Sequence, residues 1–160
     1  MSAPFIIRPA RPGDESGICA AHIASIRGVC ARDYTPEQVE AWCEGKTPAL
    51  YESLIAKGGW YVAETASGIV GLGAVEIQGE RAEVKGLYIA PQVIGQGVGA
   101  ALLRQLLADA RAAGATSVFV KGTTTAEPFY RRAGFVLIGA STHRTRGGVE
   151  LPSVAMEMPL

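Results

Sequence analysis

The sequence predicts an α+β domain. Three observations carry this prediction. Helical spacing of apolar residues dominates the first third of the chain, three strand-like runs follow one another between residues 60 and 89, and a long amphipathic helix then leads into a further strand. A strand, helix, strand crossover of this kind is right-handed and places its two strands parallel.

The chain begins with signals for one strand and one helix. A β-prone run at residues 5–8 is stopped by Pro9. Asp14 then offers an N-cap for a helix whose apolar side chains recur at helical spacing from Ile18 to Ile26. We therefore expect strand one to lead directly into helix one.

A second and a third helix follow. Thr35 and Gln38 have the spacing of a capping box, and Pro36 suits the first helical position, so this helix is expected to run to about Cys43. Residues 49–57 predict the third helix, because a glycine pair ends the helical spacing there.

The remaining two thirds alternate between sheet and helix. Residues 60–64, 69–77 and 81–89 predict an antiparallel meander, and Gly86 inside its third strand predicts a β-bulge. The strongest helix of the chain is expected over residues 97–113. The last predicted elements are a strand at 117–121, a short helix at 125–132, and strands at 135–141 and 152–158.

Composition limits the class of protein. A chain of 160 residues that is 48% hydrophobic and 19% charged predicts one autonomously folding domain over residues 1–160. Lys plus Arg equal Asp plus Glu at 15 each, which argues against a nucleic-acid partner. No signal peptide or membrane-length apolar run is found, so we expect a cytoplasmic protein without a membrane partner. Three unpaired cysteines predict reduced thiols and no metal site.

The most informative motif is a glycine-rich turn at the start of the long helix. Gly95, Gly97 and Gly99 alternate with other residues directly after a predicted strand. Glycines let the backbone approach a ligand closely, and the free amides of a first helical turn attract anions. The turn therefore predicts a phosphate or pyrophosphate site, although an ordinary strand-to-helix turn would also explain one of the glycines.

Two other phosphate motifs fit poorly. Gly95, Gly97 and Ala100 match the dinucleotide fingerprint, but three strands precede them, and the region after the next strand offers Lys121 where that motif needs an acid. The sequence around Lys46 imitates the end of a Walker P-loop, yet Glu40 stands where its first glycine belongs.

Several segments together resemble the GNAT superfamily of acyl-CoA-dependent N-acetyltransferases. They are residues 82–89 with Pro91, the glycine turn with the following leucines of its helix, and residues 126–135, which look like the family's motif B. The resemblance covers nearly the whole chain. It implies a mixed, mostly antiparallel twisted sheet of about seven strands flanked by helices, with parallel strands four and five splayed apart around acetyl-CoA.

The same resemblance implies a set of coenzyme-binding residues. Pantetheine would pair with the bulged fourth strand, and the pyrophosphate would lie on the helix amides. The implied residues are Leu87, Tyr88, Ile89, Ile94, Gly95, Gln96, Gly97, Val98, Gly99, Ala100, Thr123, Ala126, Phe129 and Tyr130. Two of these depart from the family pattern, because Ile94 stands in place of Arg or Gln and Thr123 in place of Asn.

Acetyl transfer needs a neutral amine, a donor to the developing oxyanion and a proton for the departing sulfur. Tyr130 resembles the family's general acid, and a phenol of pKa near 10 stays protonated at neutral pH. A backbone amide near Leu87 or Tyr88 is the expected oxyanion donor. Glu83 matches the position of a general base acting through water, with a solvent-exposed ion pair to Lys85 or Arg81 as the competing interpretation.

The acceptor is expected to be a small-molecule or peptide amine. Candidates for contacting it are His22, Ser25, Arg27, Tyr34 and Trp42, from the helical region that covers the acceptor side in this family. For His22 the favoured interpretation is instead a semi-buried, hydrogen-bonded histidine. A noncatalytic acyl-CoA-binding module is the alternative function, and a homodimer through C-terminal edge strands is a further expectation.

Overall fold

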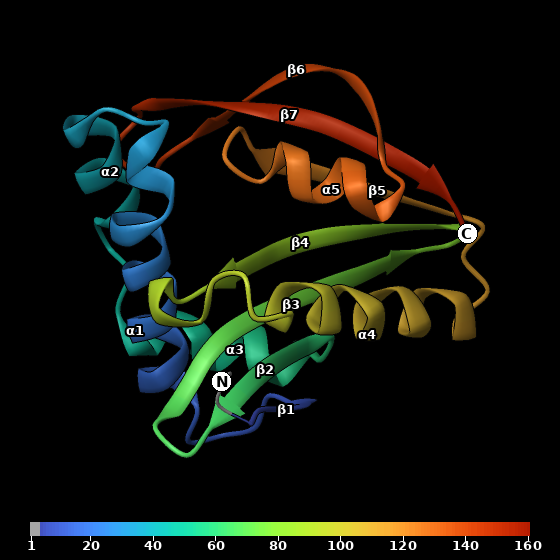
Figure 1. Cartoon of the computed structure of the whole chain (residues 1–160), viewed down its shortest axis with the longest axis horizontal. Coiled ribbons are helices and arrows are strands. Elements are labelled where there is room, and N and C mark those ends of the chain that lie inside the picture. Colours follow the sequence, from blue (N-terminus) through green and yellow to red (C-terminus); the bar gives the residue numbers. More distant parts are fainter. Residues whose placement is uncertain (1–3) are drawn as a thin grey trace.

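A computed structural model describes residues 4–160 and shows seven strands in one mixed sheet (Figure 1). The strand order is β1-β2-β3-β4-β5-β7-β6. The strands are β1 (Ile6–Pro9), β2 (Trp60–Thr65), β3 (Gly68–Gln78), β4 (Arg81–Ile89), β5 (Ser117–Thr123), β6 (Val136–Arg144) and β7 (Glu150–Pro159). All pairs are antiparallel except β4 with β5, which confirms the predicted mixed sheet.

Five α-helices flank the sheet, close to the predicted ranges. They are α1 (Glu15–Gly28), α2 (Pro36–Cys43), α3 (Pro48–Lys57), α4 (Val98–Ala112) and α5 (Glu127–Ala133). Two short 3-10 helices, η1 (Cys30–Arg32) and η2 (Pro91–Val93), were not predicted. The capping box of α2 is complete, because Gln38 N–H donates to Thr35 Oγ1 and Thr35 N–H donates to the Gln38 side chain.

Asp14 occupies the N-cap position of α1, as predicted, but its side chain does not act as the cap. Its side chain makes no capping hydrogen bond to α1. The carboxylate instead accepts two hydrogen bonds from the Arg8 guanidinium, at 2.8 and 2.9 Å, and one from the backbone N–H of Arg11. The charge-assisted hydrogen bonds to the half-buried Arg8 guanidinium therefore take the place of the local capping interaction.

The parallel pair β4–β5 separates midway. Its register runs from Arg81 opposite Ser117 to Val84 opposite Val120 and ends there. Beyond that point β5 pairs only with β7, while β4 continues along β3 as far as Ile89. The splayed strands that the family resemblance implied are therefore present, and the β5-facing edge of β4 has no strand partner beyond Val84 within residues 4–160.

A β-bulge lies where the strands separate. In the β3–β4 register Gly86 is opposite Ala74, but Val84 is opposite Val75, so Lys85 is an extra residue. The bulge predicted from Gly86 is thus confirmed, one residue from that glycine. An extra residue shifts the alternation of side chains by one position.

The bulge decides which face of the sheet each β4 side chain occupies. Ala82 and Val84 before it, and Leu87 and Ile89 after it, all pack in the clusters on the α4 side. Tyr88 instead packs with α1 and α3 on the opposite face. The bulge therefore places one aromatic side chain on the α1 side of the splayed region.

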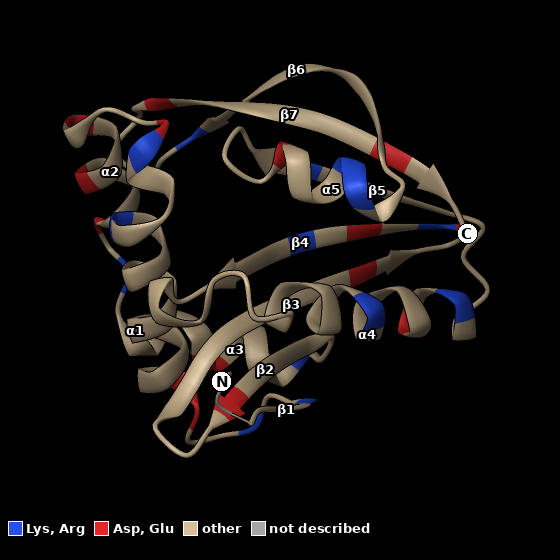
Figure 2. Cartoon of the chain, in the orientation of Figure 1, with Lys and Arg blue, Asp and Glu red and all other residues tan. Residues whose placement is uncertain are grey.

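The surface carries mixed charge. Figure 2 shows Lys and Arg interspersed with Asp and Glu over the helices and strand ends. Among residues 4–160, no helix is long and apolar enough to cross a membrane. Cys19, Cys30 and Cys43 are buried free thiols, as the sequence predicts.

Candidate active site

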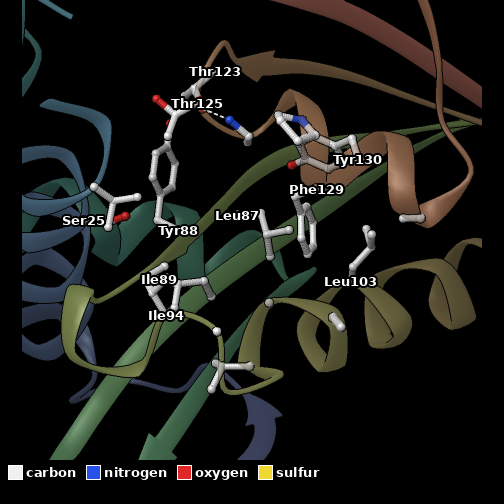
Figure 3. Close-up of a pocket in the computed structure, with 18 of the residues that line it drawn as sticks. Ser25, Leu87, Tyr88, Ile89, Ile94, Leu103, Thr123, Thr125, Phe129 and Tyr130 are labelled. Atoms are coloured by element: carbon white, nitrogen blue, oxygen red, sulfur yellow. Dashed lines mark hydrogen bonds between the residues drawn. The ribbon is translucent and has the colours of Figure 1, made fainter. Parts of the chain in front are cut away.

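A cavity of about 780 Å³ opens where β4 and β5 separate. Its walls come from β4, the glycine turn, α4, the β5–α5 turn and α5 on one side, and from α1 and η1 on the other. Figure 3 shows Ser25 and Tyr88 toward one side of this cavity and Leu103, Phe129 and Tyr130 toward the other. The lining is mostly apolar with a few polar groups, which is typical of a small-molecule site.

The glycine turn brings unpaired amides to the cavity. Gly95 and Gly97 have φ of 79° and 84°, which only glycine adopts without strain. The first helical bond of α4 runs from Ala101 N–H to Gly97 C=O. The amides of Val98, Gly99 and Ala100 have no backbone acceptor within residues 4–160, and free amides at the start of a helix favour an anion at this end of the cavity.

Most of the residues implied for coenzyme binding line this cavity. They include Leu87, Tyr88 and Ile89 of β4, Ile94 to Ala100 except Gln96, and Thr123, Ala126, Phe129 and Tyr130. Gln96 points elsewhere, because its side chain donates to the Gln92 carbonyl at 3.2 Å. The open edge of β4 supplies further unpaired backbone groups along the same wall.

Tyr130 is held in the cavity wall by packing. It is 3% exposed, and its ring lies 5.2 Å from those of Phe129 and Phe135. Gly122 of β5 leaves room for it, since a Cβ there would lie 3.1 Å from the ring. Burial raises the pKa of the Tyr130 phenol well above its ordinary value of 10, so the hydroxyl keeps its proton at neutral pH.

The β5–α5 turn presents threonines to the cavity. Thr123 Oγ1 accepts a hydrogen bond from Ala126 N–H at 3.1 Å (Figure 3), so the hydroxyl in the family's Asn position caps this turn. Thr125 Oγ1 is buried and has no hydrogen-bond partner within residues 4–160. Because buried hydroxyls are nearly always paired, this orphaned group fits a bound ligand.

The candidates for the acceptor side are divided. Ser25 lines the cavity, whereas His22, Arg27, Tyr34 and Trp42 do not. Arg27 is exposed and pairs with Glu40 at 3.3 Å.

His22 takes the buried, hydrogen-bonded arrangement. Its Nδ1 lies 2.9 Å from the Tyr51 hydroxyl, and its ring centroid lies 4.1 Å from that of Tyr88. Burial lowers the pKa of His22 to about 3, so the imidazole is neutral at physiological pH.

Tyr34 and Trp42 belong to one buried cluster with Cys30, which lines the cavity. The Tyr34 hydroxyl donates to the Pro152 carbonyl at 2.6 Å and accepts from Thr124 N–H at 3.1 Å. It therefore ties the segment after η1 to β7 and to the β5–α5 turn. Trp42 packs against Tyr34 with ring centroids 5.2 Å apart.

Glu83 lies outside the cavity lining. Its carboxylate is 3.4 Å from Lys85 Nζ, as in the ion-pair interpretation, and also accepts from Gln78 at 3.5 Å. The role of Glu83 as a general base stays a prediction that this geometry does not favour.

Several lining residues were not found from the sequence. Leu103 and Leu107 share a face of α4, and that helical spacing was a usable signal. Cys30 and Arg32 of η1 carried no such signal, because the 3-10 helix itself was not predicted. Burial raises the pKa of Cys30 to about 12, so this thiol is protonated at neutral pH.

Comparisons with known proteins agree with this geometry. The family model described as an acetyltransferase (GNAT) domain matches residues 30–160. An uncharacterized N-acetyltransferase of Escherichia coli, YafP, is 26% identical over 141 residues, which cover 88% of this chain and 87% of YafP.

Solved structures give the same result. A GCN5-related N-acetyltransferase from Rhodopseudomonas palustris superposes with a TM-score of 0.89 at 28% identity, covering 100% of this chain and 98% of its own. PaiA N-acetyltransferase from Thermoplasma acidophilum, solved with coenzyme A, shares the fold with a TM-score of 0.77 at 18% identity over 98% and 99% of the two chains. The match of the family model over most of the sequence shows that this chain belongs to the GNAT family of acetyltransferases.

Proposed function

We propose that this protein transfers the acetyl group of acetyl-CoA directly to the primary amine of a small molecule or peptide. The observation that carries the proposal is the position of the cavity. It lies between strands that separate at Val84 and Val120, and one end is formed by the unpaired first-turn amides of α4. An elongated ligand with an anionic end suits this shape.

The residues present fit acetyl-CoA as the acyl donor. The amides of Val98, Gly99 and Ala100 would hold its pyrophosphate, and the open edge of β4 would hold its amide-containing arm. The orphaned hydroxyl of Thr125 is a further hydrogen-bonding group on the same wall. PaiA, which shares this fold, was solved with coenzyme A.

Direct transfer forms a C–N bond and breaks the thioester C–S bond. The amine loses a proton to solvent, and the departing sulfur gains one from a donor in the protein that solvent then reprotonates. Tyr130 is proposed as the acid that supplies it, because its phenol lies in the cavity wall and burial keeps it protonated. A backbone N–H of β4 near Leu87 or Tyr88, on the edge without a strand partner, is proposed to stabilise the oxyanion.

Calorimetry with acetyl-CoA and a thiol-release assay with a panel of amines test this function together. We expect binding of acetyl-CoA and release of one thiol for each amine acetylated. Absence of binding contradicts the proposal. Binding without thiol release from any amine would instead support the noncatalytic acyl-CoA-binding module.

Some expectations stay predictions. The homodimer through C-terminal edge strands is one. It is consistent with β6, an edge strand in which Val136 and Ile138 are exposed by 66% and 53%. A cytoplasmic location and the absence of a metal and of nucleic-acid or membrane partners are the others. Light scattering would measure the oligomeric state.

A further inference from the structure

The charges that line the cavity all have one sign. Its charged lining residues are Arg32, Arg104 and Arg132, and no Asp or Glu lies among the described lining residues. Arg104 and Arg132 come from α4 and α5, on the walls assigned to the coenzyme and its phosphates. Arg32 comes from η1, on the opposite wall with Ser25 and Cys30. The acceptor-side wall therefore has a cation of its own.

The positive charge of Arg32 is not neutralised by the protein. Within residues 4–160 its guanidinium forms no ion pair or side-chain hydrogen bond, whereas Arg27, earlier on the same segment, is paired with Glu40. Asp33, the adjacent acid, does not line the cavity. An arginine fork is well suited to a carboxylate or phosphate, and it repels a second cation.

From this arrangement, and resting on the proposed function, we propose that the acceptor is an amine that also carries an anionic group, a carboxylate or a phosphate, which Arg32 binds. Amino acids and amino phosphates have this chemistry. Polyamines do not, and the charge of Arg32 disfavours them by repulsion. Arg32 thus selects the acceptor and takes no part in proton transfer.

Matched pairs of acceptors test the proposal. Thiol release with acetyl-CoA is measured for a panel of amino acids and for the corresponding amino acid amides, with putrescine as a dication. We expect kcat/KM to be about tenfold or more higher for the acid than for its amide, because the amide loses one charge-assisted hydrogen-bonded pair with Arg32. Putrescine should give the lowest kcat/KM. An amide or putrescine that is used as well as the acid overturns the proposal.

Variants assign the effect to the residue. In Arg32→Gln we expect the preference for acid over amide to fall to about onefold through a higher KM, with kcat unchanged, and Arg32→Lys to restore part of it. Arg111→Gln, an exposed arginine near the far end of α4, is the matched control and should keep the preference.

Calorimetry with acetyl-CoA distinguishes whether Arg32 binds an anionic group of the acceptor or one of the coenzyme. If Arg32→Gln weakens acetyl-CoA binding and leaves the preference among acceptors unchanged, Arg32 belongs to the coenzyme and the proposal is wrong. If no acceptor of the panel, whether acid, amide or putrescine, gives thiol release, both the proposed function and this inference are overturned. Turnover of neutral amines without a preference overturns only this inference.

Discussion

The two walls of the cavity are built by different means. The coenzyme wall, formed by β4, the glycine turn and α5, exposes backbone groups at the splay and at the start of α4. The acceptor wall, formed by α1 and η1, exposes side chains such as Ser25 and Arg32. Backbone sites tolerate many side chains, so the first wall suits a constant coenzyme. The second wall can change with single residues, which suits a variable acceptor.

The largest expected effect is a loss of kcat without a loss of coenzyme affinity, from a residue of the coenzyme wall. Tyr130→Phe removes the proposed proton donor and keeps the ring that packs against Phe129 and Phe135. We expect kcat to fall by about 10²-fold or more, with the acetyl-CoA Kd unchanged. Steady-state kinetics and calorimetry measure the two quantities.

Tyr61→Phe is the matched control for this loss. It also removes a phenol oxygen, one that donates to the Asp109 carboxylate at 2.5 Å, but Tyr61 does not line the cavity. We expect kcat within about twofold of the wild type. A Tyr130→Phe enzyme with full activity would show that another group protonates the sulfur.

The next effect tests whether the two walls are coupled. Tyr34→Phe deletes the hydroxyl that joins the segment after η1 to β7 and to the β5–α5 turn. We expect the free energy of unfolding to fall by about 2 kcal/mol, one for each lost hydrogen bond. We also expect acetyl-CoA to bind several-fold more weakly, because the turn carries Thr123 and Thr125. Urea unfolding and calorimetry measure both.

Thr35→Ala supplies the comparison, because it removes the capping box one residue away without touching the turn. This variant should lose about 1 kcal/mol of stability and keep its affinity. Equal affinities in Tyr34→Phe and the wild type would mean that the walls are independent.

A smaller change in free energy is expected from a substitution in the glycine turn. Gly97→Ala places a Cβ at φ of 84°, which shifts the turn that carries the amides. We expect an acetyl-CoA Kd about tenfold higher, equivalent to about 1.4 kcal/mol, because the displaced amides bind the pyrophosphate less well. Gly114→Ala introduces the same strain at φ of 88° past the other end of α4, so it should lose stability without losing affinity. Equal losses of affinity in both variants would contradict the assignment of the amides.

The smallest expected effect is a loss of stability from breaking the Arg8–Asp14 ion pair at the start of α1. The Arg8 guanidinium holds the pKa of Asp14 below its ordinary value of 3.8. The stability from this pair is therefore present above pH 3.8 and is lost as the pH falls through the lower folded-state pKa. We expect Asp14→Asn to lose about 1 kcal/mol at pH 7 and almost nothing at pH values below that folded-state pKa, by urea unfolding. A difference that does not depend on pH would contradict this origin.

The sequence predicted the coenzyme wall far better than the acceptor wall, and the reason is physical. Glycines at positive φ, the bulge near Gly86 and the capping box at Thr35 are local features that short stretches determine. The position of His22 depends on a contact with a distant segment, at Tyr51. The partner of Asp14 is Arg8, which is close in sequence but belongs to another element, the strand β1. No local spacing indicates such contacts, and the 3-10 turn that carries Arg32 has no periodic pattern.

The most direct test of the account is an amide-resolved NMR titration of the 160-residue protein with acetyl-CoA. We expect the largest shift changes at the amides of Val98, Gly99 and Ala100, with smaller ones along the second half of β4. Saturating binding that leaves those three amides unchanged and shifts residues elsewhere would contradict the assignment of the cavity.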